Sequence, residues 1–590
     1  MGLVTKEQED GSLKHRLVLD LSRHVNSCIE LPHVRLSHLD RALEITEQGD
    51  LQLIFDLVSA YYHIKIEETQ QKFLGAAFQN SDGSTMYIQY AHLPFGLASA
   101  VHVITKIWKP LSRYLSAQGI RNSIYIDDGR ILAKSAKEMT EKGAFAYETI
   151  SKAGWAIEPK KSDKISNAST EKKYLGFLIN TEDMEVKASK KKVAKTQAEI
   201  KQLLGRTQTP VKHLAKVLGI ITSLEPSHGM SARISTRSGY SALAEHTETF
   251  GWKGLIHLSE GMHREIKFFE EGINERNGSP IKSKLRQIRL EMILENPIAK
   301  KMTLDFHKQA GEIMVSDASD NKVYVYNLAS TERTILEANF TQEQRSWASG
   351  ARELLGLLFT LRQWRESGQM KKSNIYWMTD SENMVTFIKK GSRRPQIQTL
   401  AFEIAQITSE LGIQIEPIHL LRQDPRIEKA DEGSKNKDTD NWSLDAWSFS
   451  MLQSQLSEPF ETDLFADCNN KRTETFFSLF YSEGTCGTDA FAQDWTKLGN
   501  LWICPPVAQL INVHRRIEDT KCRGMIVFPF WESSNFLPLF MENFETPKNP
   551  YKLVRKWKPF IIQNENARNT ALFGPTPFYF IALSFDTRAE

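Results

Sequence analysis

The stretch NSIYIDDGRILA, residues 122–133, decides what fold this chain is expected to have. Two short apolar segments flank the adjacent acids Asp127 and Asp128, and Gly129 follows them. This pattern predicts a β-hairpin that carries both acids at its tip. Adjacent carboxylates repel each other unless cations neutralise them, so the pair is either a solvated turn or part of a metal site.

A second apolar segment, LQLIFDLVSAYYHIKI (residues 51–66), predicts a strand that ends at Asp56. On a strand beside the hairpin, Asp56 would add a third carboxylate. Three carboxylates could hold two Mg²⁺ ions, which bind oxygen ligands and leave positions open for phosphate. Taken alone, Asp56 could equally cap the end of its strand.

Three further motifs accompany these two acidic segments in a fixed order. The five together resemble the reverse transcriptases of retroelements, whose motifs run FD-x-x-x-A-Y, LPFGL-x-S-A, Y-x-DD, a lysine-bearing loop and YLGF. A segment upstream, DGSLKHRLVLDLSRHVN (residues 10–26), is similar to the fingers strands of that family. The three accompanying motifs are YAHLPFGLASA (90–100), GWAIEPKKSD (154–163) and KKYLGFLIN (172–180).

The resemblance implies an RNA-directed DNA polymerase that binds an RNA template, a DNA primer and deoxynucleoside triphosphates. Asp56, Asp127 and Asp128 would hold two Mg²⁺ ions, or Mn²⁺ in their place. Arg16 would clamp the triphosphate, because a planar guanidinium makes paired bonds to phosphate oxygens. Either Lys6 or Lys14 could assist it.

Other positions of the motifs are implied to contact the substrates. Tyr61 would press against C2′ of the incoming sugar, or simply pack in the core. Gly96 would allow the template backbone to approach closely. Lys161 is a candidate general acid for the pyrophosphate leaving group, or else a solvated lysine. The residues implied to grip the primer are Leu175, Gly176 and Phe177.

A second set of acids follows at spacings of 36, 27 and 51 residues. Two of them end apolar strands and one sits on an amphipathic helix, so they are expected to converge at one edge of a mixed sheet. The order is similar to retroelement ribonuclease H, which implies a second two-metal site that cleaves the RNA of RNA–DNA hybrids. The four acids implied to be catalytic and metal-binding are Asp317, Glu353, Asp380 and Asp431.

The end of this second motif departs from the family pattern. Ile427 stands where the family has Asn, and Gly433 follows the last acid, so Asp431 is the least secure ligand. Taken alone, Glu353 would be a surface salt-bridge partner and Asp431 a loop acid. His419 could assist product release.

The last region, with segments such as TDLFADCNN (462–470), looks like the tail of DIRS-type retrotransposon polymerases. That group implies a separately encoded tyrosine recombinase as a partner. Its tail has been likened to adenine methyltransferases, whose [DN]-P-P-[YF] loop would correspond here to Cys504, Pro505, Pro506 and Val507. Because the polar residue and the aromatic are both missing, we expect a degenerate, Rossmann-like domain without methyl transfer.

The expected architecture is α+β and multidomain: a right-hand polymerase, a ribonuclease H-like α/β domain and the Rossmann-like tail. Only nine residues precede Asp10, which predicts shortened fingers and puts present activity in question. The predicted boundaries are 1–185 for fingers and palm, 186–300 for a helical thumb and connection, 301–436 for the nuclease, 437–454 for a linker and 455–590 for the tail.

Composition limits the alternatives. With 75 basic against 72 acidic residues, the net charge of +3 gives no general affinity for nucleic acid, which must come from local runs such as Lys190–Lys192. That run could also be a solvated helix face. The longest apolar run, 578–585, is too short to cross a membrane, which predicts an intracellular protein of the cytoplasm or nucleus.

Four of the five cysteines recur every 18 residues, without a C-x-x-C pair, and are expected to be buried free thiols and not metal ligands. Two other functions stay open. One is a catalytically silent, element-derived protein that only binds RNA or hybrids. The other is a host polymerase for telomere or primer synthesis.

Overall fold

The computed structural model describes residues 2–7, 13–18, 21–22, 25–30, 39–281, 312–328, 333–370, 374–436, 442–559, 561–563 and 576–588. These residues form two compact units. The first comprises Met1–Ala232 and Leu243–Pro297, and the second comprises Arg233–Ala242 and Ile298–Glu590.

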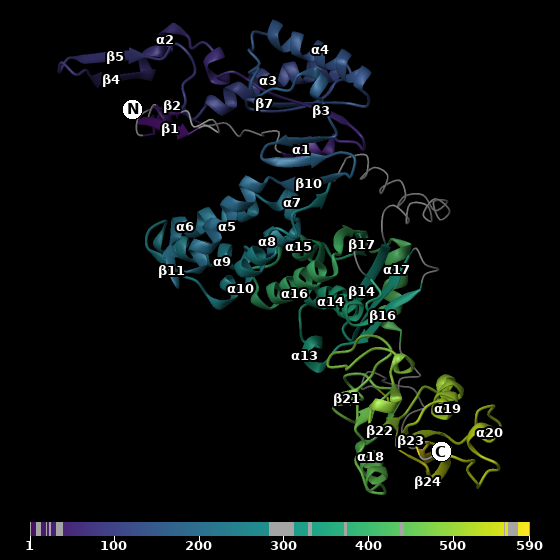
Figure 1. The fold of residues 1–590 in the computed structure, drawn as a ribbon. Coiled ribbons are helices and arrows are strands. Elements are labelled where there is room, and N and C mark those ends of the chain that lie inside the picture. Colours follow the sequence, from purple (N-terminus) through teal and green to yellow (C-terminus); the bar gives the residue numbers. More distant parts are fainter. Residues whose placement is uncertain are drawn as a thin grey trace. The chain divides into compact units, whose positions relative to one another are not determined.

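The centre of the first unit is an antiparallel sheet of β3 (Leu51–Asp56), β7 (Asp128–Ala133) and β6 (Arg121–Tyr125), in that order. The helices α3 (Ala100–Ala117) and α4 (Ala136–Lys152) pack on this sheet (Figure 1). Their apolar side chains and those of the strands, among them Phe55, Trp108 and Ile131, form one buried cluster. The alternating apolar pattern of the sequence therefore supplies the core face of the sheet.

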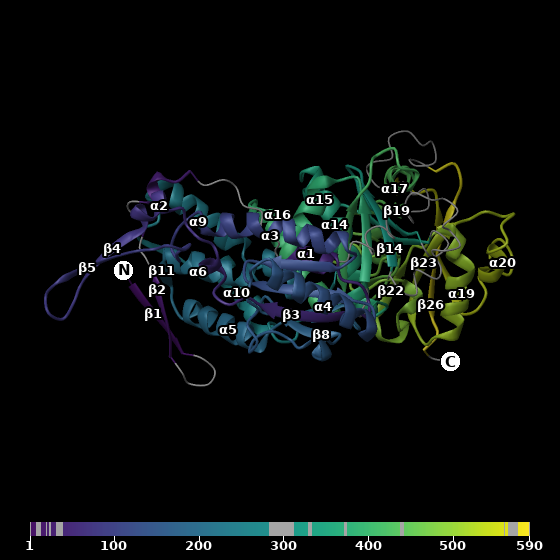
Figure 2. The same ribbon diagram turned by 90° about the horizontal axis from the view of Figure 1, so that it is seen from above.

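The other elements of this unit are hairpins, a second sheet and a helical region. The hairpins are β1 (Gly2–Glu7) with β2 (Leu13–Val18), β4 (Gly75–Gln79) with β5 (Thr85–Gln89), and β11 (Gln208–Pro210) with β12 (Leu255–His257). The second sheet runs β13 (Ser279–Pro280), β10 (Glu185–Ala188), β9 (Phe177–Asn180), β8 (Glu171–Tyr174). The described α-helices within this unit are α1 (Leu39–Glu44), α2 (Glu68–Gln71), α5 (Lys190–Leu204), α6 (Val211–Thr222), α7 (Glu225–His228) and α10 (Glu260–Glu271), of which α5 lies beside α6 and α10 (Figure 2). The helices α8 (Met230–Ile234) and α9 (Arg237–Phe250) have residues in both units.

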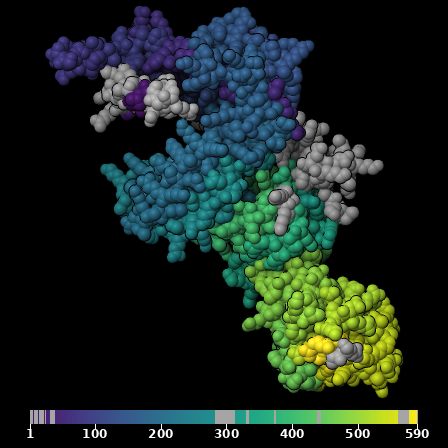
Figure 3. Space-filling view, viewed as in Figure 1, coloured from purple at the N-terminus to yellow at the C-terminus, as the bar shows by residue number. Residues whose placement is uncertain are grey.

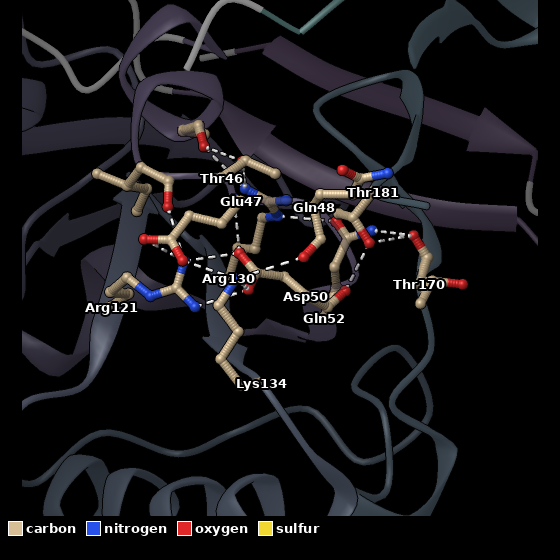
Figure 4. A network of polar contacts seen from close by, with 12 residues as sticks. Thr46, Glu47, Gln48, Asp50, Gln52, Arg121, Arg130, Lys134, Thr170 and Thr181 are labelled. Atoms are coloured by element: carbon tan, nitrogen blue, oxygen red, sulfur yellow. Dashed lines mark hydrogen bonds and ion pairs between the residues drawn. The ribbon is translucent and has the colours of Figure 1, made fainter. Parts of the chain in front are cut away.

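A network of buried polar side chains supports the strands of the central sheet (Figure 4). Asp50 is fully buried and accepts two hydrogen bonds from the Arg121 guanidinium, at 2.6 and 2.7 Å, while Lys134 Nζ lies 2.9 Å away. Burial alone would raise the pKa of Asp50, but these bonds hold it below its ordinary value. Arg130, also fully buried, donates to Gln52 and to Thr46. Burial lowers the pKa of Arg130 to about 10, while the charges of Tyr174 and Asp50 oppose the drop.

We expect Arg121→Leu to destabilise this unit by about 3 kcal/mol, because it leaves the buried Asp50 carboxylate with one partner fewer. Since the folded pKa of Asp50 is below its ordinary value, its contribution is present above pH 4 and lost as the pH falls further. Urea unfolding followed by hydrogen exchange of the β3 and β7 amides measures the change. Lys152→Met, which removes the exposed Glu148 pair, is the control and should cost less than about 0.5 kcal/mol; an equal cost for both variants would contradict the role of Asp50.

The second unit contains a five-stranded sheet in the order β16 (Thr334–Asn339), β15 (Lys322–Asn327), β14 (Glu312–Ala318), β17 (Asn374–Thr379), β18 (Gln414–His419). The first three strands are antiparallel, whereas β17 and β18 run parallel to β14. Both α14 (Ser349–Ser367) and α17 (Pro425–Lys435) pack against β14 and β15. The remaining helices are α13 (Gln342–Arg345), α15 (Glu382–Lys390) and α16 (Pro395–Leu411).

The C-terminal residues, green to yellow, form a continuous body in the space-filling view (Figure 3). Their sheet has the order β21 (Thr475–Phe476), β20 (Thr462–Asp463), β22 (Asn500–Ile503), β23 (Arg523–Pro529), β26 (Phe580–Asp586), β24 (Tyr551–Trp557), of which the first four are parallel. A two-stranded sheet pairs β19 (Trp442–Leu444) with β25 (Ile561–Gln563), and the helices are α18 (Ala446–Gln453), α19 (Leu510–Asp519) and α20 (Leu537–Phe540).

Both faces of this C-terminal sheet are buried, which explains its continuous apolar runs. Along β23, Ile526 and Phe528 join a core that includes α19, while Met525 and Val527 face a second core. That second core contains Trp442, Leu444 and Leu452 from β19 and α18. The predicted linker at 437–454 is therefore wrong from residue 442 onward, because its polar composition concealed three large apolar side chains.

No helix among the described residues is long and apolar enough to span a membrane. The described part of 186–300 contains four short strands besides its helices. Residues 282–300, at the end of the predicted thumb and connection, lie outside the described part.

Candidate functional site

The first acidic cluster lies where β3 meets the β6–β7 hairpin. Asp56 and Asp128 are register partners on neighbouring antiparallel strands. The turn between β6 and β7 consists of Ile126 and Asp127, and Ile126 has φ +56°. A β-branched residue rarely adopts this conformation, so the surrounding sheet forces the tight turn that carries the acids.

A glycine is required directly after the acids. A Cβ at Gly129 would lie 1.9 Å from the ring of Phe55, its register partner on β3. The ring of Phe55 therefore occupies the space above the hairpin, and the DDG sequence satisfies both the turn and this packing.

The electrostatics of the cluster reflect the crowding of like charges. Burial, then Asp127 and Asp56, raises the pKa of Asp128 to about 6, while Lys161 opposes the rise. Lys161 Nζ lies 3.0 and 3.2 Å from the two carboxylate oxygens of Asp56. The lysine is thus positioned against an acid of the cluster and is not a merely solvated side chain.

Tyr61 lies beside this cluster, half-buried in a 3-10 helix, and its ring packs edge-on against Phe95 at 5.1 Å. Burial, followed by the charge of Asp127, raises the pKa of the Tyr61 hydroxyl. Tyr61 therefore packs in the core and also lies near the acids.

Gly96 has φ +105°, and its carbonyl accepts a hydrogen bond from the Asn26 amide.

The predicted primer grip is the turn between β8 and β9. Leu175 and Gly176 both have positive φ, while Phe177 is buried. Lys192 Nζ lies 3.9 Å from the centre of the Phe177 ring and donates to the Ser223 carbonyl. Burial lowers the pKa of Lys192 to about 8, so this lysine belongs partly to the core of the unit.

Arg16 lies on β2, opposite Val4. Its side chain, like those of Lys6 and Lys14, lies outside the described residues.

The second acidic cluster lies at the edge of the five-stranded sheet. Asp317 ends β14 and Asp380 follows β17, and the parallel register of these strands places the two acids level. Glu353 projects from α14, which packs on β14. Oxygen atoms of Asp317, Glu353 and Asp380 all lie within 4.8 Å of one another.

The donor set of this cluster fits a divalent cation. Glu353 is only 5% exposed, and its Oε2 is buried without a hydrogen-bond partner. Burial, then the charges of Asp317 and Asp380, raises the pKa of Glu353 well above its ordinary value. Burial likewise raises the pKa of Asp317. A buried carboxylate that faces two others and has one oxygen without a hydrogen bond is what a hard cation with oxygen ligands would stabilise.

In the part of the chain that the structure describes, Asp56, Asp127 and Asp128 do not meet the same distance criterion. Asp431 is also outside the compact group: on α17 it pairs with Lys435 at 2.5 Å and lies 3.5 Å from Arg422. All four acids of the second set nevertheless line one cavity, together with His419.

Packing explains the two residues of α17 that depart from the expected motif. Ile427 is fully buried, and a Cβ at Gly433 would lie 2.4 Å from the ring of Tyr324. Sequence reasoning missed Ser434, whose hydroxyl donates to Asp317 at 2.6 Å. Its place three residues after Asp431, on the same helix face, was the available indication.

In the C-terminal part, Cys504 directly follows β22 and is buried, and Asp463 on β20 is buried as well. Burial raises the pKa of Asp463 to about 7 and that of the Cys504 thiol well above its ordinary value. Of the four regularly spaced cysteines, Cys504 and Cys522 are buried and Cys468 is partly buried, but Cys486 is exposed, contrary to the expectation. All five are free thiols.

Comparison with protein families gives two matches along the chain. Residues 12–179 match the family described as reverse transcriptase (RNA-dependent DNA polymerase). The chain carries a reverse transcriptase domain. Both Asp56 and the hairpin acids lie within it. Residues 432–544 match the family described as DNA N-6-adenine-methyltransferase (Dam), a range that begins on α17.

A curated relative is the "Putative enzymatic polyprotein" of Cassava vein mosaic virus, 24% identical over 230 residues. The match covers 37% of this chain and 33% of the relative, so the chain spans about a third of the relative's length. Solved structures that resemble the chain include foamy viral protease-reverse transcriptase with double-stranded DNA (14% identity, 71% of this chain and 65% of that one, TM-score 0.39). Another is the same viral protein with an RNA/DNA hybrid, which is 16% identical, covers 74% of this chain and 51% of its own length, and has a TM-score of 0.38.

We expect Glu353→Gln to raise the melting temperature in EDTA by roughly 2–4 °C, because it removes the charge of a buried carboxylate that has one oxygen without a hydrogen bond. The folded pKa of Glu353 is raised, so its ionisation costs stability as the pH rises above about 4.3, and the gain should be larger at pH 8 than at pH 5. Mg²⁺ should stabilise the natural protein in proportion to ln(1 + [Mg²⁺]/Kd) and the variant much less.

The matched control is Glu343→Gln on α13, an exposed acid of the same unit, which should leave both measurements unchanged. An unaltered Mg²⁺ response in Glu353→Gln would rule out this carboxylate as a ligand.

Proposed function

We propose that the chain is the RNA-directed DNA polymerase of a retrotransposon and that it also cleaves the RNA of RNA–DNA hybrids. The observation that carries the polymerase is the pairing of Asp56 with Asp128 beside a strained turn holding Asp127, within the reverse transcriptase domain. Crowded carboxylates whose pKa values rise are typical of sites that bind catalytic cations.

The polymerase chemistry would use the acids as ligands of two Mg²⁺ or Mn²⁺ ions, which when bound lower the pKa of the primer 3′-hydroxyl and stabilise charge on the transferring phosphate. Tyr61 would bound the sugar pocket, and Lys161, 3.0 Å from Asp56, would hold a proton for the leaving pyrophosphate. We assign triphosphate binding to Arg16, template approach to Gly96, and primer contact to Leu175, Gly176 and Phe177.

The nuclease proposal rests on the second cluster. The parallel pairing of β14 with β17 places Asp317 and Asp380 level, beside the antiparallel strands β15 and β16. The helix α14 brings Glu353 within 4.8 Å of both acids. Asp431, held 2.5 Å from Lys435, would complete the ligand set once a cation competes for it. Such a site suits in-line attack of water on a phosphodiester, and the hybrid would be recognised through its 2′-hydroxyls.

For the C-terminal part we propose a DIRS-type tail with a methyltransferase-like, Rossmann-like fold and no methyl transfer. The match to the Dam family and the four parallel strands support the fold. Against transfer stands Cys504, a buried thiol with a raised pKa where a polar amide acceptor is needed. This assignment also implies a separately encoded tyrosine recombinase for integration.

We expect Asp127→Asn to lower DNA synthesis on an RNA template with Mg²⁺ at least about 100-fold, by analogy with the loss of one preorganised charge-stabilising group. The same variant should still degrade the RNA of a preformed hybrid. Asp380→Asn should do the reverse, so each variant is the matched control for the other. Primer extension and hybrid cleavage by the full chain are the two measurements.

Loss of both activities in either variant would contradict two separate sites. Equal synthesis by the natural protein and Asp127→Asn would overturn the polymerase assignment. Binding of hybrid without synthesis or cleavage by the natural protein would favour the catalytically silent alternative.

The tail is tested by calorimetric titration of the full chain with S-adenosylmethionine. We expect no binding at micromolar concentration, because no glycine-rich loop follows Asp463. We also expect no methyl transfer, because burial keeps the Cys504 thiol protonated and it cannot replace the amide-accepting group. Micromolar affinity, with methyl transfer to adenine in DNA, would contradict the proposal.

A further inference from the structure

The second acidic cluster opens into a cavity of about 1180 Å³. One wall is the sheet edge with Asp317, Glu353 and Asp380, and the other comes from loops of the C-terminal part. Both walls belong to the second compact unit. The cavity exceeds the range of about 300–1,000 Å³ usual for small-molecule sites, so it has room for more than a small ligand.

The loop wall is attached to the helix that carries Glu353. On α14, Arg362 bonds both oxygens of Glu403 at 2.8 and 3.0 Å, and it also reaches Glu483 at 3.1 Å and the Tyr481 hydroxyl at 2.9 Å. The next residue, Gln363, accepts a hydrogen bond from the Tyr481 backbone at 2.8 Å. Charge-assisted bonds from a shared helix fix the distance between the loop wall and the acids.

A second attachment joins the loop wall to the sheet. The Asn339 side chain donates to Asp467 at 2.9 Å, and Asn469 donates to the Phe340 carbonyl. Asn339 ends β16, the outermost strand of the five-stranded sheet. The wall is thus held at two points and is a fixed part of the cavity.

The loop wall is aromatic where it faces the cavity. Phe465, Phe480 and Phe491 are partly exposed, and Leu479 is 72% exposed. Phe465 and Phe491 pack edge to face at 5.7 Å, and Phe491 also stacks on the buried Trp495. Rings with one buried edge and one open face are preorganised to stack on a flat ligand.

The chemistry of the two walls selects the occupant. An acidic peptide offers carboxylates but few flat faces that could stack on the rings, and a fully paired duplex keeps its bases stacked on each other. Unpaired nucleotides present flat faces to aromatic side chains, and each stacked base strengthens binding by about 5- to 150-fold. The strand that reaches both walls must also carry the phosphodiester cleaved at the acids.

We propose that the aromatic wall binds unpaired nucleotides of the RNA strand, next to the phosphodiester that the second acidic cluster cleaves. The inference rests on the proposed nuclease function and extends it. The C-terminal part would thereby be a substrate-binding part of the nuclease, one that engages RNA where it leaves the hybrid.

The test is photo-crosslinking of the full chain to a hybrid whose RNA has a single-stranded extension containing 5-iodouridine, at either end. We expect crosslinked peptides from residues 464–491. Phe491→Leu keeps an apolar side chain but removes the stacking face, and it should reduce this crosslink at least about 5-fold. Trp447→Ala, which changes an exposed aromatic of α18 that does not line the cavity, is the control and should change nothing.

The two proposals fail in different ways. Crosslinks confined to residues 1–281, or equal yields from the natural protein and Phe491→Leu, would overturn the aromatic wall. A single cooperative thermal unfolding transition shows that Phe491→Leu is folded. If the natural protein cleaves no hybrid while the Phe491-dependent crosslink persists, the nuclease assignment fails and RNA binding by the wall stands.

Discussion

The repulsion between neighbouring carboxylates is the constraint on which both acidic clusters depend. Isolated in water, such groups would turn apart, so the backbone must hold them together. Strand register does this in each unit: Asp56 and Asp128 are antiparallel partners, while Asp317 near the end of β14 and Asp380 directly after β17 lie level on parallel neighbours. Burial first, and then the neighbouring acids, raise the pKa values of Asp128 and Glu353, and the surrounding packing must offset this cost.

The two units offset this cost differently. In the first, Lys161 already partners Asp56, and a fully buried network around Asp50 and Arg130 fixes the strands behind the acids. In the second, Glu353 has an oxygen without a hydrogen-bond partner, and the Ser434 hydroxyl donates to Asp317. In the proposed function, the second cluster therefore gains more from a bound cation than the first.

In the proposed function, the C-terminal part keeps a methyltransferase-like fold without methyl transfer. Its sheet is buried on both faces, and the loop that follows β22 begins with a buried thiol. Its loops contribute instead to the cavity of the second cluster, where Arg362 ties them to α14. A binding surface places fewer requirements on its residues than a catalytic site does, because stacking needs aromatic faces and no charged group of defined pKa.

The sequence by itself determined the elements and the local chemistry. Alternating apolar residues specified β3, β7 and β14, and the DDG turn specified the hairpin, because these patterns act between residues close in the chain. It could not reveal that Gly129 makes room for Phe55, or that Trp442 belongs to a core. Nor could it show that Leu479 and Phe491 share a cavity with Glu353, or that Asp431 stands apart from the other three acids. Those facts depend on contacts between distant segments, and only the tertiary structure decides which distant segments meet.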